Sequence, residues 1–238
     1  MGCTLSRILL KTSLLDELRR LIDEAEFYRD LLTTDDEIRV EVSLTDTGER
    51  ATLKIGELLE VGEESADLDL RLTMEERVFE ALLDGEADFA ALIGRSRMSD
   101  VRPINFEFLN SERIPEIYES MKALMTFFFT PGRVKVKRLR EELAGEAHGA
   151  HPIPITYWDG LRFAWYLVKE GQTMNEEGER DDYPQAVIIL KGRGIFTIGD
   201  VEIAIEPSTV IYVPKNCLHQ LRADEDVEIV WLAWQTPP

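Results

Sequence analysis

The sequence predicts an α+β domain over residues 1–131 and an all-β domain over residues 152–238, joined by a linker over residues 132–151. In the first segment apolar residues recur with helical spacing in some places and alternate in others, whereas in the last they only alternate. The linker is charged, contains Gly and His, and has neither period. Strands followed by segregated helices are typical of α+β domains, and closely spaced short strands are typical of a sandwich or closed barrel.

Composition argues against several classes of protein. The formal net charge of −19 argues against a protein that wraps nucleic acid, because phosphate binding needs clustered Lys and Arg. No apolar run approaches the roughly 18 residues that a membrane span needs, so we expect a soluble protein without stable membrane insertion. Cys3 and Cys217 cannot form a disulfide framework and no signal peptide is visible, so the expected compartment is the cytoplasm. Residues 1–6 fit an N-myristoylation pattern, with a chance helix start as the alternative.

The first predicted element is an amphipathic helix. From residue 5 to residue 32 apolar side chains recur at helical spacing, with charged residues on the other face. Thr12 and Ser13, followed by Asp16 and Glu17, resemble a capping signal. This segment is therefore one helix or two helices of unequal length.

A strand hairpin is predicted after the helix. Residues 38–44 alternate apolar and polar side chains, residues 46–49 read as a turn, and alternation returns over residues 51–55. This pattern indicates two antiparallel strands. Residues 66–72 alternate again, so we expect a third strand in the same sheet.

Helical spacing then resumes. We expect helices over residues 74–83 and 87–93, with Gly85 between them. A last strand is predicted over residues 104–108. A helix that Ser111 opens and that ends in three Phe residues closes the domain.

Two segments of this domain carry a family resemblance. Residues 68–75 read Leu-Asp-Leu-Arg-Leu-Thr-Met-Glu, and residues 82–88 read Leu-Leu-Asp-Gly-Glu-Ala-Asp. With the order of the elements over about residues 14–129, they resemble the strand, helix and Leu-x-Gly-Glu-x-Asp turn of sterol carrier protein 2 domains. The resemblance implies a curved antiparallel sheet roofed by helices, with an apolar tunnel for a fatty acid, an acyl-CoA or a sterol-like ligand.

The predicted tunnel lining consists of large apolar side chains, for which an ordinary packed core is the alternative. Aromatic residues carry much apolar area, and Met adapts to irregular shapes. The predicted ligand-binding residues are Phe79, Leu82, Leu83, Phe89, Leu92, Phe106, Phe108, Met121, Leu124, Met125 and Phe128. Arg95, Arg97 and Arg102 lie where the family commonly has a Gly-x-x-x-Ile-x-Gly strand. They are either solvated or hold a carboxylate or phosphate head group.

The C-terminal domain is predicted to contain strands alone. Gly and Pro separate alternating apolar runs at short intervals. The predicted strands cover residues 163–167, 186–190, 195–197, 201–205, 210–213 and 227–234. The segment Trp231-Leu232-Ala233-Trp234 suits a core or an interface between subunits, and core is favoured.

The strands also carry the spacing of a second family. A cupin metal-site motif, Gly-x5-Pro-x-Gly-x2-His-x3-Asn, has its five positions at Ser208, Pro214, Asn216, His219 and Ala223. Only Pro214 and His219 keep the family's residue. Residues 185–192 match Glu-x6-Gly of the other cupin motif, with Gln in place of Glu. The resemblance covers about residues 152–236 and implies a cupin-like β-barrel.

This predicted cupin has lost most of its metal ligands. Catalytic cupins usually hold a metal through three imidazoles and a carboxylate, and here one imidazole at most remains. We therefore predict no cofactor and no metal site. The alternative is a weakly held divalent ion, with Glu177, Glu179 or Asp181 as oxygen ligands beside Gln185 and His219.

The predicted cupin pocket consists of Gln185, His219, Glu179 and Asp181. His219 either lines the barrel, hydrogen-bonded to a neighbour such as Gln185, or contacts a polar ligand. His148 and His151 lie in the linker without nearby Cys, which is a weak metal signal. Cys217 is more typical of a buried small apolar residue than of a nucleophile.

The leading hypothesis is non-enzymatic binding or carriage of a lipid-like ligand in the N-terminal domain. The cupin domain then serves dimerisation or a second ligand site, and the cupin resemblance implies a homodimer paired through edge strands. No catalytic residue is predicted, because no P-loop, dinucleotide-binding turn or nucleophile elbow is present. The alternatives are a metal-dependent cupin enzyme acting on a small molecule with a non-standard ligand set, and a structural interaction scaffold.

Overall fold

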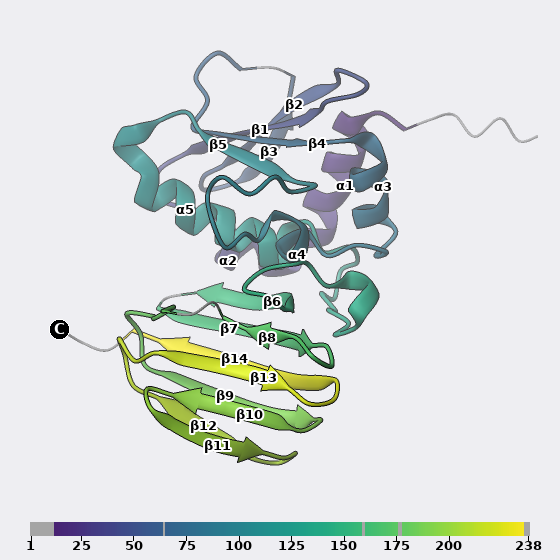
Figure 1. The fold of residues 1–238 in the computed structure, drawn as a ribbon. Helices are drawn as coiled ribbons and strands as arrows, with labels where there is room; N and C mark the ends of the chain where they lie inside the picture. The colour runs from purple at the N-terminus through teal and green to yellow at the C-terminus, as the bar shows by residue number, and fades with distance from the viewer. Residues whose placement is uncertain (1–11, 64, 159, 176–177, 236–238) are drawn as a thin grey trace, which may run out of the picture.

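The computed structural model describes residues 12–63, 65–158, 160–175 and 178–235. The N-terminal lipidation pattern, the first residues of the predicted N-terminal helix and Glu177 lie outside the described residues. An N-terminal α+β domain lies against a C-terminal domain of strands. Helices of the first domain lie between its sheet and the strands of the second (Figure 1).

The N-terminal sheet has five strands in the order β3-β2-β1-β4-β5. The strands are β1 (Ile38–Leu44), β2 (Arg50–Ile55), β3 (Leu59–Gly62), β4 (Leu70–Met74) and β5 (Asn105–Phe108). The predicted hairpin is confirmed, because β1 and β2 pair antiparallel with Val40 opposite Leu53.

The sheet is mixed, so the predicted antiparallel sheet is wrong. β1 and β4 run parallel, with Val40 opposite Leu70 and Val42 opposite Leu72. β3 was not predicted from the sequence, and it covers the outer edge of β2. β4 pairs with the edge of β1 that β2 leaves free. Alternation of apolar and polar residues predicts that a segment is a strand, but it gives no information about the direction of that strand.

Helices and short helical turns complete this domain. They are α1 (Leu14–Ala25), η1 (Glu26–Tyr28), α2 (Arg29–Leu32), α3 (Glu76–Leu83), α4 (Phe89–Ile93), η2 (Ser111–Arg113), α5 (Ile114–Ala123) and η3 (Leu124–Phe128), with η4 (Glu141–Leu143) in the linker. The predicted cap is confirmed, since the Ser13 hydroxyl accepts a hydrogen bond from the backbone N–H of Asp16 (3.2 Å). Met74, predicted as helical, is the last residue of β4. In the part of the chain that is described, none of the helices has the length and apolar character required to cross a membrane.

The N-terminal core lies between the sheet and these helices. Phe89 of α4 stacks on Phe129 with ring centroids 4.2 Å apart, and Phe128 meets Phe129 edge-on at 5.0 Å. Phe128 is the last residue of the π-helical turn η3. Phe127, on the same turn, lies 6.0 Å from the ring of Trp158 in the second domain. Of the three consecutive Phe residues, Phe128 and Phe129 therefore pack in the N-terminal core and Phe127 contacts the C-terminal domain.

The strands of the C-terminal domain form two sheets, ordered β12-β9-β14-β7-β6 and β11-β10-β13-β8. The strands are β6 (His151–Trp158), β7 (Leu161–Val168), β8 (Thr173–Met174), β9 (Gln185–Lys191), β10 (Gly194–Ile198), β11 (Val201–Ile205), β12 (Val210–Val213), β13 (His219–Ala223) and β14 (Val227–Trp234). Phe196 and Leu221 of one sheet share a core with Val187 and Ile229 of the other. Among the described strands the sheets do not close into one hydrogen-bonded barrel, so the predicted barrel is corrected to two facing sheets.

Three strands of this domain were not predicted from the sequence. β6 contains Pro152 and Pro154. An edge strand tolerates proline, but in a sequence proline argues against a strand, so β6 was not predicted. β8 has only two residues. β13 carries the polar residues His219, Gln220 and Arg222, so its apolar alternation is weak.

The predicted core role of residues 231–234 holds for part of the segment. They belong to β14, which pairs with β7 and β9; Ala233 is buried and Trp231 packs against the core, whereas Trp234 is 37% exposed. Ser208 and Asn216 occupy Gly positions of the cupin motif, and their φ angles are 68° and 59°. Glycine adopts such positive values most easily, so the backbone of the motif persists although its glycines are replaced.

A buried ion pair joins the linker to both domains. The Lys137 Nζ lies 2.7 Å from the Asp88 Oδ2 and donates to the Pro154 carbonyl (3.1 Å). Asp88 also caps α4 by accepting from the Ala91 N–H (2.9 Å). The two charged side chains are only 12% and 10% exposed. Nearby, Gly145 lies so close to α4 that an added Cβ would be 2.3 Å from the Ala91 carbonyl oxygen.

Replacing Gly145 by Ala is expected to push the linker away from α4 and to lower the free energy of unfolding by about 1–3 kcal/mol, the usual effect of overpacking. Gly62→Ala is the matched control, because nothing lies within 4 Å of its added Cβ, and its effect should stay within about 0.5 kcal/mol. Urea unfolding measures both variants. Equal destabilisation of the two would contradict the close approach at Gly145.

Candidate functional site

Most of the apolar residues predicted to line a tunnel lie in the N-terminal core. The buried members are Phe79, Leu82, Phe89, Met121, Leu124, Met125 and Phe128. Partly buried members that pack against the same core are Leu83, Leu92, Phe106 and Phe108. Three of the set, Phe106, Met121 and Met125, also line an apolar cavity at the junction with the C-terminal domain.

Three of the four residues predicted for a cupin pocket meet in the C-terminal domain. The Gln185 Oε1 accepts from the Trp231 Nε1–H (2.8 Å), and the Gln185 Nε2 donates to the Asp181 Oδ2. The His219 Nε2 lies 3.8 Å from the same Asp181 oxygen, and its Nδ1–H donates to the Cys217 carbonyl (3.0 Å). Both Gln185 and His219 are buried. Asp181, rather than Gln185, is thus the polar side-chain neighbour of His219, and the ring of Phe196 stacks on its imidazole.

This donor set does not fit the metal site that the cupin resemblance implies. One imidazole lies beside one carboxylate, and the Gln185 amide is hydrogen-bonded through both its oxygen and its nitrogen. Over the described ranges, no group of three or more His, Cys, Asp and Glu side chains is arranged to hold a metal ion, and the linker residues His148 and His151 form no such group either. The arrangement suits hydrogen bonding inside the domain.

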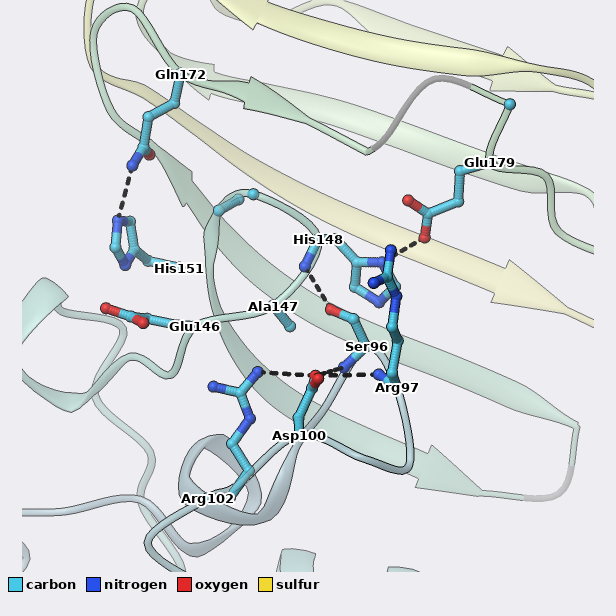
Figure 2. Close-up of a pocket in the computed structure, with 13 residues that line it drawn as sticks. Ser96, Arg97, Asp100, Arg102, Glu146, Ala147, His148, His151, Gln172 and Glu179 are labelled. Carbon is cyan, nitrogen blue, oxygen red and sulfur yellow. Dashed lines mark hydrogen bonds and ion pairs between the residues drawn. The ribbon is translucent and has the colours of Figure 1, made fainter.

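A polar pocket of about 690 Å³ lies between the two domains. Loop 94–103 of the N-terminal domain forms one wall, the linker forms another, and loops of the C-terminal domain complete it (Figure 2). Its polar lining includes Arg97, Asp100, Arg102, His148, His151 and Glu179. The pocket therefore combines cationic, acidic and imidazole groups from segments that are far apart in the sequence.

A single carboxylate organises the loop of this pocket. The Asp100 Oδ2 accepts hydrogen bonds from the backbone N–H groups of Ser96 and Arg97 (both 3.1 Å), and the Arg102 Nη2 lies 3.4 Å away (Figure 2). These donors lower the pKa of Asp100 below its ordinary value, with the Arg97 N–H having the largest effect. Asp100 thus holds Arg102 at the pocket, and the buried Arg102 Nε–H makes no hydrogen bond among the described residues.

His148 joins three segments around the pocket. Its backbone N–H donates to the Ser96 Oγ (2.8 Å), and its carbonyl accepts from the Asn175 N–H (2.8 Å). Its Nδ1 is paired with Glu179. Glu179 was predicted with the cupin pocket residues, but the structure places it here, across from the linker (Figure 2).

An apolar cavity of about 210 Å³ adjoins the polar pocket. Ala147 and His148 line both. The cavity wall combines Phe106, Met121 and Met125 of the N-terminal domain with residues of β6 and β7. The two cavities together offer a charged region next to an apolar one.

Arg95 lies at this apolar cavity. Its guanidinium carbon is 4.4 Å from the ring centroid of Phe106, and its Nη2 donates to the Ile104 carbonyl (3.2 Å). Burial lowers the pKa of Arg95, repulsion by Arg102 lowers it further, and Asp100 partly offsets both effects. Two guanidinium groups therefore face the same region.

Sequence reasoning identified these arginines but placed their ligand in the N-terminal domain. It missed the role of the linker, because contacts such as the one between Ser96 and His148 join residues 52 positions apart. It also missed Gln172, whose Nε2 lies 3.5 Å from the His151 Nε2 in the same pocket. The available signal was the linker pair His148 and His151, which are two of only three His residues in the chain.

Comparison with known families identifies part of the chain. A family model described as "Cupin domain" matches residues 164–234, which is less than a third of the chain. The match begins inside β7 and does not include the N-terminal domain. The resemblance of that domain to sterol carrier protein 2 therefore stays a prediction.

Solved structures give distant likenesses. The plu4264 protein from Photorhabdus luminescens is 14% identical over 42% of this chain and 88% of its own, with a TM-score of 0.39. A cupin 2 conserved barrel domain protein from Salinispora arenicola CNS-205 is 16% identical over 43% of this chain and 90% of its own, with a TM-score of 0.39. Rru_A2000 from Rhodospirillum rubrum, a cupin-2 domain, is 22% identical over 38% of this chain and 63% of its own, with a TM-score of 0.34. No curated protein matches this chain, and these likenesses carry no argument about function.

The hydrogen bonds to Asp100 predict a pH dependence. Because its folded-state pKa is lowered, Asp100 favours the folded state above the ordinary pKa of 3.8, and this contribution is lost as the pH falls through the lowered value. Carboxyl ¹³C NMR, with Asp100→Asn to assign the signal, should show a titration midpoint below 3.8. A midpoint at or above that value would contradict the arrangement of the loop.

Proposed function

We propose that this chain, in which residues 164–234 are a cupin domain, binds a small lipid-like acid without chemical turnover. The acid group occupies the polar pocket beside Arg102 and Arg95, and a short apolar part occupies the adjoining apolar cavity. The observation that carries this proposal is the junction of the two cavities at Ala147 and His148.

The charges at this junction support an anionic ligand. Burial and the repulsion by Arg102 lower the pKa of Arg95, so a bound anion stabilises the charged form of Arg95. Arg102 lines the polar pocket, and guanidinium groups bind carboxylates through paired N–H donors. These arginines offer a local anion site on a chain whose net charge is −19.

The volumes support a short apolar group. The polar pocket of about 690 Å³ falls within the usual range for small-molecule sites, about 300–1,000 Å³. The apolar cavity of about 210 Å³ equals about seven times the roughly 30 Å³ that one water molecule occupies. A methylene group is about as large as a water molecule, so a chain of about six or seven carbons fills this cavity, whereas a sterol exceeds it.

The two alternative functions draw less support from these contacts. A metal-dependent cupin enzyme would use His219 and Asp181, and the usual further imidazoles are not beside them among the described residues. An interaction scaffold requires neither cavity. Ligand binding at the junction accounts for the arginines and for both cavities, so we prefer it.

Octanoate is a suitable probe for this proposal. We expect it to bind the full chain, and we expect Arg102→Gln to weaken binding about tenfold or more, because a hydrogen bond to a charged group contributes about 1.5–3 kcal/mol. Isothermal titration calorimetry at neutral pH measures both affinities.

Arg19→Gln is the matched control for this experiment. Arg19 is exposed on α1, where it pairs with Asp16 (3.1 Å), far along the chain from the pocket residues. 1-Octanol tests the acid group and should bind more weakly than octanoate. If octanoate does not bind the wild-type chain, or binds the Arg102 and Arg19 variants equally, the proposal fails.

We also propose that the chain forms a homodimer through the edge strands of its C-terminal domain. β11 and β12 each lie at the end of a sheet. They expose apolar side chains, among them Val201 (56%), Val210 (47%) and Tyr212 (71%). An exposed apolar edge strand is a template for pairing with another chain.

Replacing Tyr212 by Lys is expected to shift the chain toward the monomer, because Lys on an edge strand opposes pairing. Val134→Lys is the control, since Val134 is exposed to a similar extent (67%) but lies in the linker. Sedimentation velocity over a series of protein concentrations measures the oligomeric state. A wild-type chain that stays monomeric, or a Tyr212 variant that associates as strongly as wild type, would contradict this dimer.

A further inference from the structure

A second pocket lies at the domain junction, between α5 and the β6–β7 hairpin. Its volume is about 510 Å³. Helix α5 contributes Tyr118 and Lys122, and the strands and loops of the C-terminal domain contribute Tyr157, Arg162 and Tyr183. It shares no lining residue with the polar pocket, but Tyr118, Lys122 and Tyr157 also line the apolar cavity.

Tyr157 and Arg162 form one side of this pocket. They lie directly opposite each other in the antiparallel β6–β7 pair, so their side chains stand on the same face of the hairpin. The guanidinium carbon of Arg162 lies 4.6 Å from the ring centroid of Tyr183. Within the described part of the chain, neither the Arg162 guanidinium nor the Tyr157 hydroxyl has a hydrogen-bond or ion-pair partner. A cationic donor and a neutral donor therefore face one cavity with their hydrogen bonds unused.

The other charges of the pocket leave Arg162 as its anion-binding group. Lys122 is paired with Glu119 and lies 5.1 Å from the ring centroid of Tyr118, so its charge is already compensated. Glu116 is exposed to solvent, where water screens its charge. An anion that enters the pocket thus meets a compensated lysine and an uncompensated arginine.

The environment keeps Tyr157 as a hydrogen-bond donor. Burial raises the pKa of Tyr157 to about 12, against an opposing effect of Arg162. The hydroxyl is therefore protonated at neutral pH. The rings of Tyr118, Tyr157 and Tyr183 add apolar faces, and aromatic faces pack favourably against planar rings.

We infer that this pocket binds a planar aromatic carboxylate. The carboxylate accepts paired N–H hydrogen bonds from Arg162 and a further hydrogen bond from the Tyr157 hydroxyl. The ring of the ligand packs on the tyrosine rings and on the plane of the guanidinium group. Arg162 lines neither the polar pocket nor the apolar cavity, so the inference does not rest on octanoate binding there.

The probe for this site is 2-naphthoate, a fluorescent planar acid. We expect it to bind the full chain, with a change in its fluorescence that reports affinity. Arg162→Gln should weaken binding about tenfold or more, and Tyr157→Phe about three- to tenfold, because each removes a hydrogen bond to a charged ligand. Tyr157→Phe keeps the ring and removes only the hydroxyl, so it tests the inference even if Arg162→Gln does not fold.

Two related molecules test the chemistry of the ligand. 2-Naphthamide has the same ring without the charge, and decahydro-2-naphthoate has the same charge without the planar ring. Both should bind more weakly than 2-naphthoate. Equal binding of the amide would remove the role of Arg162 as an anion site, and equal binding of the saturated acid would remove the requirement for an aromatic ring.

Variants at the two pockets separate this inference from the proposed function. Arg19→Gln is the control for a surface arginine, and circular dichroism verifies that each variant is folded. Wild-type affinity for 2-naphthoate in both Arg162→Gln and Tyr157→Phe would overturn the inference. Loss of 2-naphthoate binding in Arg102→Gln, with wild-type affinity in Arg162→Gln, would also overturn it, because that result places the acid in the polar pocket. Octanoate titrations of Arg162→Gln test the proposed function independently, because Arg162 lines neither of its cavities, whereas Tyr157 also lines the apolar cavity.

Discussion

The buried ion pair between Lys137 and Asp88 is the contact on which the arrangement of the two domains depends. Asp88 caps α4, and Lys137 carries the linker past α4 and bonds the Pro154 carbonyl of β6. Because both charges are largely removed from water, the loss of either partner leaves the other unpaired in a buried position. One contact therefore sets where α4, the linker and β6 meet. The apolar cavity, which has residues of α4, the linker and β6 in its wall, and the polar pocket that adjoins it lie beside this meeting point, whereas the pocket of Arg162 and Tyr157 lies between α5 and the β6–β7 hairpin.

The interiors of the two domains offer less to a ligand than the junction does. The N-terminal core is filled by stacked rings such as Phe89 and Phe129, and in the C-terminal domain hydrogen bonds link Asp181 to Gln185. At the junction, surfaces of different character meet and leave space between them. Interfaces between domains are common places for small-molecule sites for this reason. The proposed ligands therefore depend on how the domains pack, and the chemistry of each pocket comes from loops and edges that neither domain needs for its own core.

Local patterns predicted those parts of the fold that depend on neighbours in the chain. The Ser13 cap, the hairpin that pairs Val40 with Leu53, and β14 as a core strand are examples. The parallel pairing of β4 with β1 was beyond such patterns, because alternation is the same in both strand directions. β6 was hidden by its prolines, which an edge strand tolerates. The sequence identified the arginines of the candidate site, and it identified Asp181 beside His219. It did not predict that linker residues such as His148 lie against the loop that carries these arginines.

By itself, the sequence determined that this protein has an α+β part followed by a strand-rich part, and that the second carries the spacing of a cupin. Both rest on periodicity and on turn positions such as Ser208 and Asn216, which are properties of short segments. Only the tertiary structure decided that Arg95 lines an apolar cavity, that this cavity adjoins the polar pocket of Arg102, and that Arg162 shares a face with Tyr157 in a second pocket. The physical reason is that a cavity between domains is the space left by two surfaces that do not fully match, and no local pattern along the chain encodes that space.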